Sequence, residues 1–412
     1  MHTRRVSIRR RGRLRGATVP AAAFPARAGR KGADAFGSSA EYLVGVEEEF
    51  MVLDARTLAL VPRGEEIVDA ADDAENIKAE IRRSMVETSS RPALTIEDLR
   101  SDLVELRRTI STVATARGLR IATAGAHPFS SAEEQEVTDT ARYRYVAGLS
   151  GWVGRRATAV FGTHVHVAVG SAEKALGVME ALVADLPVLV ALSTTSPVWD
   201  GHDTGFASAR LAVRAELPRT GLPPRFESLA DYDATLEALR RSGLVPDSSY
   251  LWWDVRMQPR LGTLEIRILD AQPSVHDTVA LAGLVQALVR HHGVAWDAGV
   301  RARPQRMIVD ENRWQALRHG MSAEFVGPRG KAVPAVKAVE QLLNRVSDDA
   351  AALGGTWALG HLHVLAARGG VATDLRDTML RTDDAVAVAR HLVELGQRDL
   401  PTGTPARELV SG

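Results

Sequence analysis

Acidic side chains recur at every second position of one short, otherwise apolar segment. Residues 45–53 read GVEEEFMVL. If this segment is extended, successive side chains point to opposite faces, so Glu47 and Glu49 share one face. Two crowded carboxylates repel, and their burial is costly unless a cation compensates them. The pattern predicts a divalent metal beside this strand, with a solvated edge strand that has an acidic face as the alternative.

Two later segments repeat this alternation of polar and apolar residues. In THVHV at 163–167, His164 and His166 share one face, and in TLEIRIL at 263–269, Glu265 and Arg267 do the same. A pair of histidines two positions apart is common in cores and on surfaces, and its commonest functional use is a zinc site. For Glu265 and Arg267, an ion pair within the strand is the alternative.

Taken together, the three segments indicate one polar site rather than three separate features. Neighbouring strands lie about 4.8 Å apart, so polar pairs on adjacent strands would converge. Hard oxygen ligands dominate the set, which favours Mg²⁺ or Mn²⁺ over zinc, and a buried arginine among metal-bound carboxylates suggests a phosphate. Glu80 and Glu87 are two further candidate ligands, for which surface charge is the alternative.

The composition narrows the kinds of chemistry that are available. The chain has 412 residues, 45% of them hydrophobic, which is enough to bury a large core. It contains no cysteine, so disulfides, thiolate metal sites and cysteine nucleophiles are excluded. No run of about 18 apolar residues is present, so no membrane span is predicted. We expect a cytoplasmic protein.

The N-terminal segment differs from the rest of the chain. Residues 1–40 hold ten of the 51 Arg and Lys residues but only one acidic residue, Asp34. They show no sustained periodicity and are predicted to be a flexible basic extension, although a start codon assigned too early would explain them equally well. We expect one catalytic domain over 41–400 and a C-terminal tail over 401–412.

Hydrophobic periodicity predicts the elements that position these residues. The clearest helix covers 96–117, with Thr95 and Asp98 in capping-box positions, and a second begins near Ser274. Further helices are expected at 173–192, 331–346 and 384–396. Strands are expected at 43–53, 76–87, 119–124, 157–169, 250–257 and 261–269. The helices should cover one face of the sheet.

These motifs resemble the type 2 glutamate–cysteine ligase family, including its carboxylate–amine ligase branch. The resemblance spans about 43–325, and its motifs occur in the family's order. They are GVEEEF at 45–50, SMVE at 84–87, HPF at 127–129, FGTHVHV at 161–167, ALSTTSPVWDGHDTGFASAR at 191–210, WDVR at 253–256, GTLEIRILD at 262–270 and ENRWQALRHG at 311–320.

The resemblance implies an α+β fold with a curved, mainly antiparallel β-sheet funnel flanked by helices, as in the catalytic core of glutamine synthetase. It also implies site residues. One metal would bind Glu47, His164 and Glu265, and a second would bind Glu49, Glu80 and Glu87, while His166 and Arg267 would face ATP phosphates. The resemblance further implies that Arg267 takes part in catalysis, and that Arg142, Arg210 and Arg256 line the substrate cleft, with Arg210 and Arg256 also catalytic.

The implied activity is ATP-dependent and forms an amide through an acyl phosphate. The substrates would be small molecules, namely a glutamate-like carboxylate with cysteine or another amine. Ala126, Met257 and Leu261 depart from the family's pattern, so the resemblance supports the phosphoryl chemistry better than the identity of the substrates.

Other functions remain open from the sequence. The alternatives are a guanidino kinase or glutamine synthetase-like enzyme, or a non-catalytic protein that binds nucleotide or RNA. The intact carboxylate set argues against the non-catalytic protein, and no nucleic-acid partner is expected. The oligomeric state stays open, and a homo-oligomer is compatible with these observations.

Overall fold

The computed structural model describes residues 35–73, 75–149 and 151–400. One antiparallel sheet lies at its centre, in the order β10-β11-β5-β1-β3-β2, and β4 pairs with the distal part of β1. Its strands are β1 (Val44–Asp54), β2 (Ile77–Ala79), β3 (Met85–Ser89), β4 (Leu119–Ala122), β5 (Gly162–Ala168), β10 (Val255–Gln258) and β11 (Thr263–Asp270). The expected mainly antiparallel sheet is therefore present.

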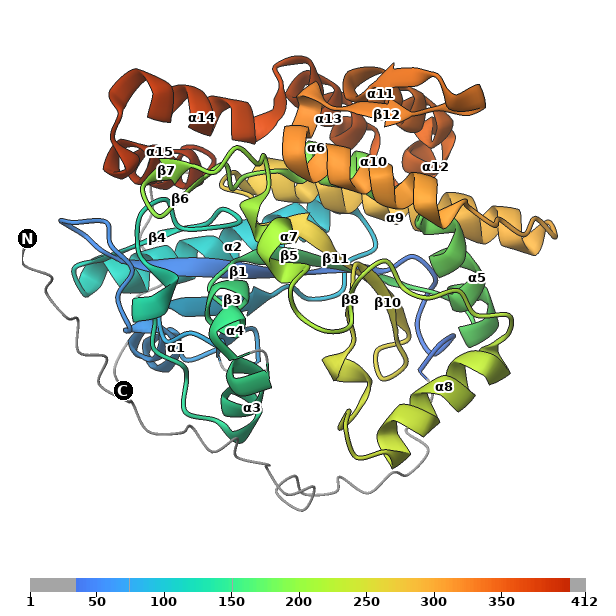
Figure 1. Ribbon diagram of the computed structural model, residues 1–412, viewed down its shortest axis with the longest axis horizontal. Helices are drawn as coiled ribbons and strands as arrows, with labels where there is room; N and C mark the ends of the chain where they lie inside the picture. Colours follow the sequence, from blue (N-terminus) through green and yellow to red (C-terminus); the bar gives the residue numbers. More distant parts are fainter. Residues whose placement is uncertain (1–34, 74, 150, 401–412) are drawn as a thin grey trace, which may run out of the picture.

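Helices lie on both sides of this sheet (Figure 1). Those packed on its apolar side and on one another include α2 (Ile96–Ala116), α5 (Ala172–Leu182), α6 (Leu186–Ser193), α9 (Val275–Asp297), α10 (Arg306–His319), α11 (Ala335–Arg345), α12 (Ser347–Ala352), α13 (Thr356–Ala367), α14 (Gly370–Thr382) and α15 (Ala385–Arg398). The helix α1 (Gly64–Ala71) packs on α2 and on the apolar face near β2 and β3. Near the sheet's edges and polar side lie α3 (Ala141–Leu149), α4 (Gly151–Ala157), α7 (Ala209–Arg214) and α8 (Leu229–Arg241). The polar face of the sheet thus looks toward the shorter helices.

The remaining strands of the described residues form three small two-stranded sheets. They are β6 (Val198–Trp199) with β7 (His202–Asp203), β8 (Thr220–Gly221) with β9 (Trp252–Trp253), and β12 (Glu324–Val326) with β13 (Ala332–Pro334). No single helix in the described part of the chain has the length and hydropathy of a membrane span. The pair α5 and α6 meets that test only when joined, and the two helices bend by 66° at the break.

The predicted capping residues act as expected. The Thr95 side chain accepts a hydrogen bond from the Asp98 backbone N–H at the start of α2, and Ser274 caps α9 in the same way. Each cap satisfies a backbone donor that the helix itself leaves unpaired. The long apolar faces of both helices pack together against the sheet.

Several predicted boundaries are wrong, and local chemistry explains most of them. Residues 76–87 form two paired strands, β2 and β3, rather than one. The helix expected over 173–192 breaks into α5 and α6, with Asp185 at the second N-cap and Pro187 in its first turn. The segment expected as a strand at 157–169 yields the shorter strand β5, and that expected at 250–257 divides into β9 and β10. A short strand, β13, precedes the helix expected at 331–346.

Residues 35–40, which belong to the expected N-terminal extension, contact the rest of the folded chain. The Ala35 backbone N–H donates to the Pro259 carbonyl at 2.8 Å, and the Gly37 N–H donates to the Val169 carbonyl at 3.1 Å. Phe36 packs against the main hydrophobic core. Residues 35–40 therefore belong to the folded unit, while 1–34 and 401–412 lie outside the described residues.

Candidate active site

The register of the central sheet aligns the predicted polar residues in a row across its strands. Glu47 lies opposite His164 and Glu49 lies opposite Glu87, so β1 carries partners on both sides. Further along, His166 lies opposite Glu265. The alternation that period two predicts is therefore present, and it brings side chains from four strands to one face.

Three glutamates form a compact acidic cluster at the β1–β3 side of this face. One carboxylate oxygen each of Glu49, Glu80 and Glu87 lies within 4.8 Å of the other two. Burial and then the charge of Glu49 raise the pKa of Glu80 to about 7. Burial and then the charges of Glu47, Glu80 and Glu49 raise the pKa of Glu87 well above its usual range. The cluster holds more negative charge than its surroundings compensate.

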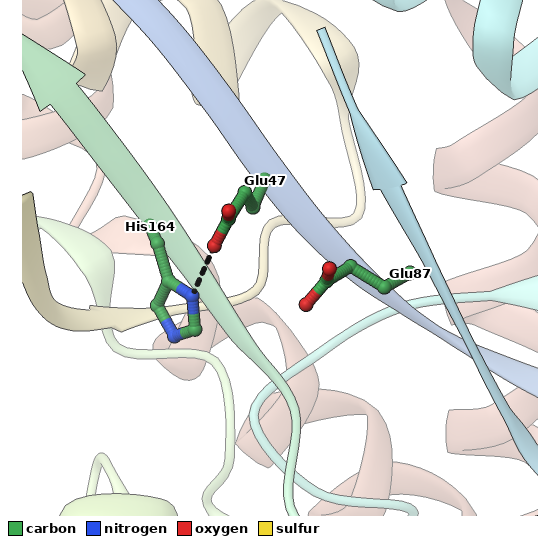
Figure 2. Close-up of side chains that lie close together, drawn as sticks. All are labelled: Glu47, Glu87 and His164. Carbon is green, nitrogen blue, oxygen red and sulfur yellow. Dashed lines mark hydrogen bonds and ion pairs between the residues drawn. The ribbon is translucent and has the colours of Figure 1, made fainter. Parts of the chain in front are cut away.

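Glu47 stands between the two imidazoles. Its carboxylate lies 3.1 Å from His164 Nδ1 and 3.6 Å from His166 Nε2, and Figure 2 shows it directed toward His164 with Glu87 on the neighbouring strand. Although burial opposes ionisation, the hydrogen bond to His164 and the nearby His166 imidazole hold the pKa of Glu47 well below its usual range. Glu47 is therefore a charged carboxylate with one imidazole on each side.

The two imidazoles differ in their surroundings. Burial and then the positive charge of Arg267 lower the pKa of His164. Burial acts in the same direction on His166, but the Glu47 carboxylate 3.6 Å away and the charge of Glu265 outweigh it and raise the pKa. His166 Nδ1 lies 3.1 Å from Thr263 Oγ1, while its buried Nε2 has no hydrogen-bond partner in the described structure.

The predicted ligand set of Glu47, His164 and Glu265 does not form one group. Ligand atoms within 4.8 Å of one another come instead from Glu47, His164 and Glu87, and from Glu47, His166 and Glu265. The reason is the antiparallel register of β5 and β11, which sets Glu265 opposite His166 and leaves His164 opposite Arg267 and Ile268 at a β-bulge. Glu265 is thereby matched to His166, and the space beside His164 goes to Arg267.

Arginines surround the Glu265 carboxylate. Arg256 Nε donates to Glu265 at 2.6 Å, and Arg267 also pairs with it. Arg256 further donates to the Leu251 carbonyl at 2.7 Å. Although burial opposes ionisation, the charges of Arg267 and Arg256 keep the pKa of Glu265 well below its usual range. Glu265 is thus a buried anion whose oxygens already hold cationic partners.

A cavity of about 210 Å³ opens over the acidic cluster. Most of the predicted residues line it, as do several that the sequence analysis did not single out. The lining comprises Glu47, Glu49, Glu80, Ile81, Met85, Glu87, Arg142, Tyr143, Val146, Thr158, Val160, His164, Arg214, Leu217, Ser249, Trp252, Arg256 and Arg267. The cavity is therefore lined by both acidic and cationic side chains.

Arg210 was expected in the cleft, but the structure places it elsewhere. Its side chain is 1% exposed and lies 3.6 Å from Asp270, with its guanidinium donating to the carbonyls of Arg267 and Ile268. It is absent from the cavity lining, whereas Arg214, one helical turn later on α7, is present there. Arg210 supports the strand that carries Arg267 rather than contacting a ligand in the cavity.

Two of the residues that the sequence analysis missed are close to predicted ones. Arg214 follows Arg210 at the i, i+4 spacing that places residues on one helix face, and Tyr143 follows Arg142. Burial and then the charges of Glu80 and Glu87 raise the pKa of Tyr143 far above its usual range. Helical spacing could have indicated Arg214, but no sequence pattern distinguishes Tyr143 from the other tyrosines of the chain.

The donor set fits a hard divalent cation. Three carboxylates within 4.8 Å of one another, two of them with raised pKa values, supply the oxygen ligands that Mg²⁺ and Mn²⁺ prefer. A cation would remove the repulsion that raises these pKa values. The Glu47, His164 and Glu87 group could hold a second cation with one nitrogen ligand.

Comparison with known proteins identifies relatives along most of the chain. The family model described as glutamate–cysteine ligase family 2 matches residues 43–392. A Rubrobacter xylanophilus protein provisionally named glutamate–cysteine ligase 2-3 is 41% identical over 325 residues, which cover 77% of this chain and 87% of that protein. A Ruegeria pomeroyi protein provisionally named glutamate–cysteine ligase 2 is 35% identical, with 87% of this chain and 96% of that protein covered.

Two solved structures share the fold at low sequence identity. A glutamate–cysteine ligase from Francisella tularensis in complex with AMP superposes with a TM-score of 0.64 at 12% identity, covering 87% of this chain and 90% of that one. A bifunctional glutathione synthetase from Pasteurella multocida superposes with a TM-score of 0.62 at 15% identity, covering 87% of this chain and 52% of that one. The central sheet and its helices therefore form the fold expected from the sequence.

Proposed function

The chain belongs to glutamate–cysteine ligase family 2, and on that premise we propose that its cavity joins a carboxylate to an amine through an acyl phosphate. The family assignment makes the protein an ATP-dependent amide-forming ligase that acts on small molecules. It does not favour a guanidino kinase, a glutamine synthetase-like enzyme or a non-catalytic nucleotide-binding protein. What we propose is the division of labour among the residues.

Glu49, Glu80 and Glu87 would hold one divalent cation, and Glu47 with His164 and Glu87 would hold another. Mg²⁺ is the first choice and Mn²⁺ the second, because oxygen ligands dominate both groups. When bound, these cations would offset the negative charge of the ATP phosphates. The observation that carries this proposal is the acidic cluster itself, which has no compensating cation of its own within hydrogen-bonding distance in the described structure.

Arg267 and His166 would face the phosphates of ATP. Arg267 lines the cavity beside His164, with its buried Nε unpartnered in the described structure, and His166 has its unpartnered Nε2. Neither nitrogen makes a hydrogen bond, since the nearest carboxylate oxygen to His166 Nε2 is that of Glu47 at 3.6 Å, and a buried donor left in this way is costly unless a ligand supplies an acceptor. Phosphate oxygens are suitable acceptors for both.

The reaction would proceed in two transfers. An oxygen of the donor carboxylate attacks the γ-phosphorus of ATP, the bond to the β–γ bridging oxygen breaks, and ADP leaves. The amine nitrogen then attacks the acyl carbon, loses a proton and displaces inorganic phosphate. No side-chain nucleophile is needed, so the residues contribute positioning and charge compensation. Arg142 and Arg256 would orient the substrates from the cavity wall, and Arg210 would keep Arg267 in place from below.

We take a glutamate-like acid as the donor and cysteine or another amine as the acceptor. The provisional names of the relatives support this choice, and the AMP in the Francisella tularensis structure supports an adenine nucleotide as the third substrate. We further propose that residues 41–400 act as one catalytic unit and that the reaction takes place in the cytoplasm.

A screen of amino-acid pairs for ADP release, with mass detection of the product, tests this proposal. We expect turnover that requires Mg²⁺ or Mn²⁺ and yields ADP, phosphate and an amide in equal amounts. Formation of an amide together with AMP and pyrophosphate would exclude the acyl phosphate. Metal-independent turnover would exclude the assigned ligand groups.

A further inference from the structure

A second hollow lies outside the active-site cavity, as an open groove between α7, α10 and the chain that passes through β8 (Figure 1). Its volume is about 950 Å³. Arg214 and Leu217 line the cavity, whereas Val213 and Glu216, beside them in the chain, line the groove. β8 likewise pairs with β9, whose Trp252 lines the cavity. One wall therefore separates the groove from the active-site cavity.

The groove is lined mainly by apolar side chains. They include Phe206, Val213, Leu222, Pro223, Pro224 and Trp314. Trp314 is 47% exposed, although its ring packs edge-on against Phe206 at 5.7 Å. Two turns earlier on α10, Met307 also lines the groove and is 86% exposed, so it projects from the surface. A contiguous exposed apolar patch of this kind marks an interaction site.

The groove also carries charges that the chain itself leaves unmatched. Arg225 and Arg306 both line it and share one carboxylate, that of Glu180, so one positive charge is in excess there. Glu216 and Asp310 line the same groove and are exposed. Their carboxylates make no hydrogen bond or ion pair with any residue that the structure describes. One surface thus holds an unmatched positive charge and unmatched negative charges.

These features fit a second copy of the chain as the occupant. In a two-fold interface a patch meets itself, so each feature needs its complement on the same surface. The groove meets this condition twice. Met307 projects beside a hollow that an apolar side chain can enter, and the excess positive charge shares the surface with free carboxylates. A surface for an unlike partner requires neither complement to be present.

We propose that this groove is the interface of a homodimer. Met307 of each protomer enters the groove of the other, and Arg225 of each protomer faces Glu216 and Asp310 of the other. An apolar centre and a charged rim are the usual arrangement of such an interface. The second protomer then covers the outer side of the wall that lines the active-site cavity. The inference does not rest on the proposed function, because it concerns a surface outside the cavity.

Sedimentation velocity of the full chain at about 1–100 µM tests the proposal. We expect a dimer that dissociates on dilution. Met307→Glu should raise the dissociation constant by about 100-fold or more, because two charges would enter the apolar centre of the interface. Met307 lies in the first turn of α10, where an acidic residue is favourable, so the protomer should keep its fold and its circular dichroism spectrum.

A matched control separates this surface from general surface polarity. Leu380→Glu makes the same kind of replacement at a residue that is 72% exposed on α14, outside the groove. It should leave the dissociation constant unchanged. An equal effect of Leu380→Glu and Met307→Glu would overturn the assignment of the groove as the interface.

A charge exchange tests the two-fold arrangement. Arg225→Glu, and separately the double variant Glu216→Arg with Asp310→Arg, should each dimerise more weakly than wild type because like charges then meet. Mixed in equal amounts, the two variants should form a heterodimer, since opposite charges face each other again at both contacts. Failure of the mixture to associate better than either variant alone would overturn the two-fold pairing.

The mass of wild type gives the remaining outcomes. A monomer over the whole concentration range would overturn the proposal and leave the groove to an unlike partner. A chain that dimerises only after removal of residues 1–34 would assign the groove to the N-terminal segment and overturn it as well. A trimer or an open series of oligomers would contradict a closed two-fold interface. None of these outcomes affects the proposed ligase activity, which ADP release measures separately.

Discussion

Replacing Glu80 by glutamine should stabilise the metal-free protein and weaken its response to Mg²⁺. Burial and the charge of Glu49 raise the pKa of Glu80 from 4.5 to about 7, so the folded protein resists the ionisation that the unfolded chain undergoes freely. A carboxyl group with a raised folded-state pKa contributes stability below pH 4.5, and that contribution is lost as the pH rises through about 7. Glutamine keeps the shape of the side chain and cannot ionise.

The size of the effect follows from the pKa difference. The shift from 4.5 to about 7 would correspond to about 3.4 kcal/mol if it were fully expressed. Glu80 keeps part of its surface in water and its acidic neighbours can share protons, so we expect about 1–2 kcal/mol of the free energy of unfolding. The gain of Glu80→Gln over wild type should be present at pH 8 and absent at pH 4.5.

Thermal and urea denaturation in EDTA and in Mg²⁺, each at both pH values, provide the assay. Wild type should gain stability from Mg²⁺ at pH 8, and Glu80→Gln should gain much less because one oxygen ligand has lost its charge. Glu134→Gln removes the same charge from an exposed position that makes no side-chain hydrogen bond or ion pair in the described structure, and it should change neither quantity. If Glu80→Gln were less stable than wild type in EDTA at pH 8, the conclusion that burial and the charge of Glu49 destabilise the ionised Glu80 would be refuted.

Three further predictions follow from the same sheet. His164→Ala should raise the Mg²⁺ concentration needed for half-maximal activity, whereas His166→Ala should mainly raise the KM for ATP. If purified wild type instead held one tightly bound zinc per chain that activity requires and that either substitution releases, both imidazoles would be zinc ligands. Glu48→Gln should lower the free energy of unfolding by about 3–5 kcal/mol, measured by urea denaturation. The buried guanidinium of Arg107, which pairs with Glu48, would lose its counter-charge. Removing residues 1–34 should leave the melting temperature nearly unchanged, while removing 1–40 should cost a further 1–2 kcal/mol or so through two lost backbone hydrogen bonds and the loss of Phe36 packing.

Strand periodicity made much of the site predictable from the sequence. Which residues share a face of a strand is a local property, and Glu47 with Glu49 lie on one face of β1 as the period of two requires. The pairing of ligands across strands is not local. It depends on the register between β5 and β11, which sets Glu265 opposite His166, and the sequence of neither strand indicates that register.

Depth within the fold was the second quantity that the sequence did not contain. Arg210 and Arg214 carry the same charge and lie one turn apart on the same face of α7. Arg210 is nevertheless enclosed beside Asp270, while Arg214 reaches the cavity. The difference arises because the start of α7 packs against β11 and is buried, whereas the end of the helix is less buried. By contrast, the break between α5 and α6 had a visible signal in Asp185 and Pro187, which are typical of a helix start.

The middle residue of the acidic triplet connects the stability of the fold to its chemistry. Glu48 points away from the cavity, where Arg107 Nε donates to it at 3.0 Å and Thr278 Oγ1 donates at 2.7 Å. This ion pair joins β1 to α2 and α9, and its loss would leave a charge buried in the core. Because a slip of one residue would reverse every side chain of β1, the ion pair also fixes the register in which Glu47 and Glu49 face the cavity. A charge that is costly to bury thus specifies which two of the three carboxylates are available to a metal.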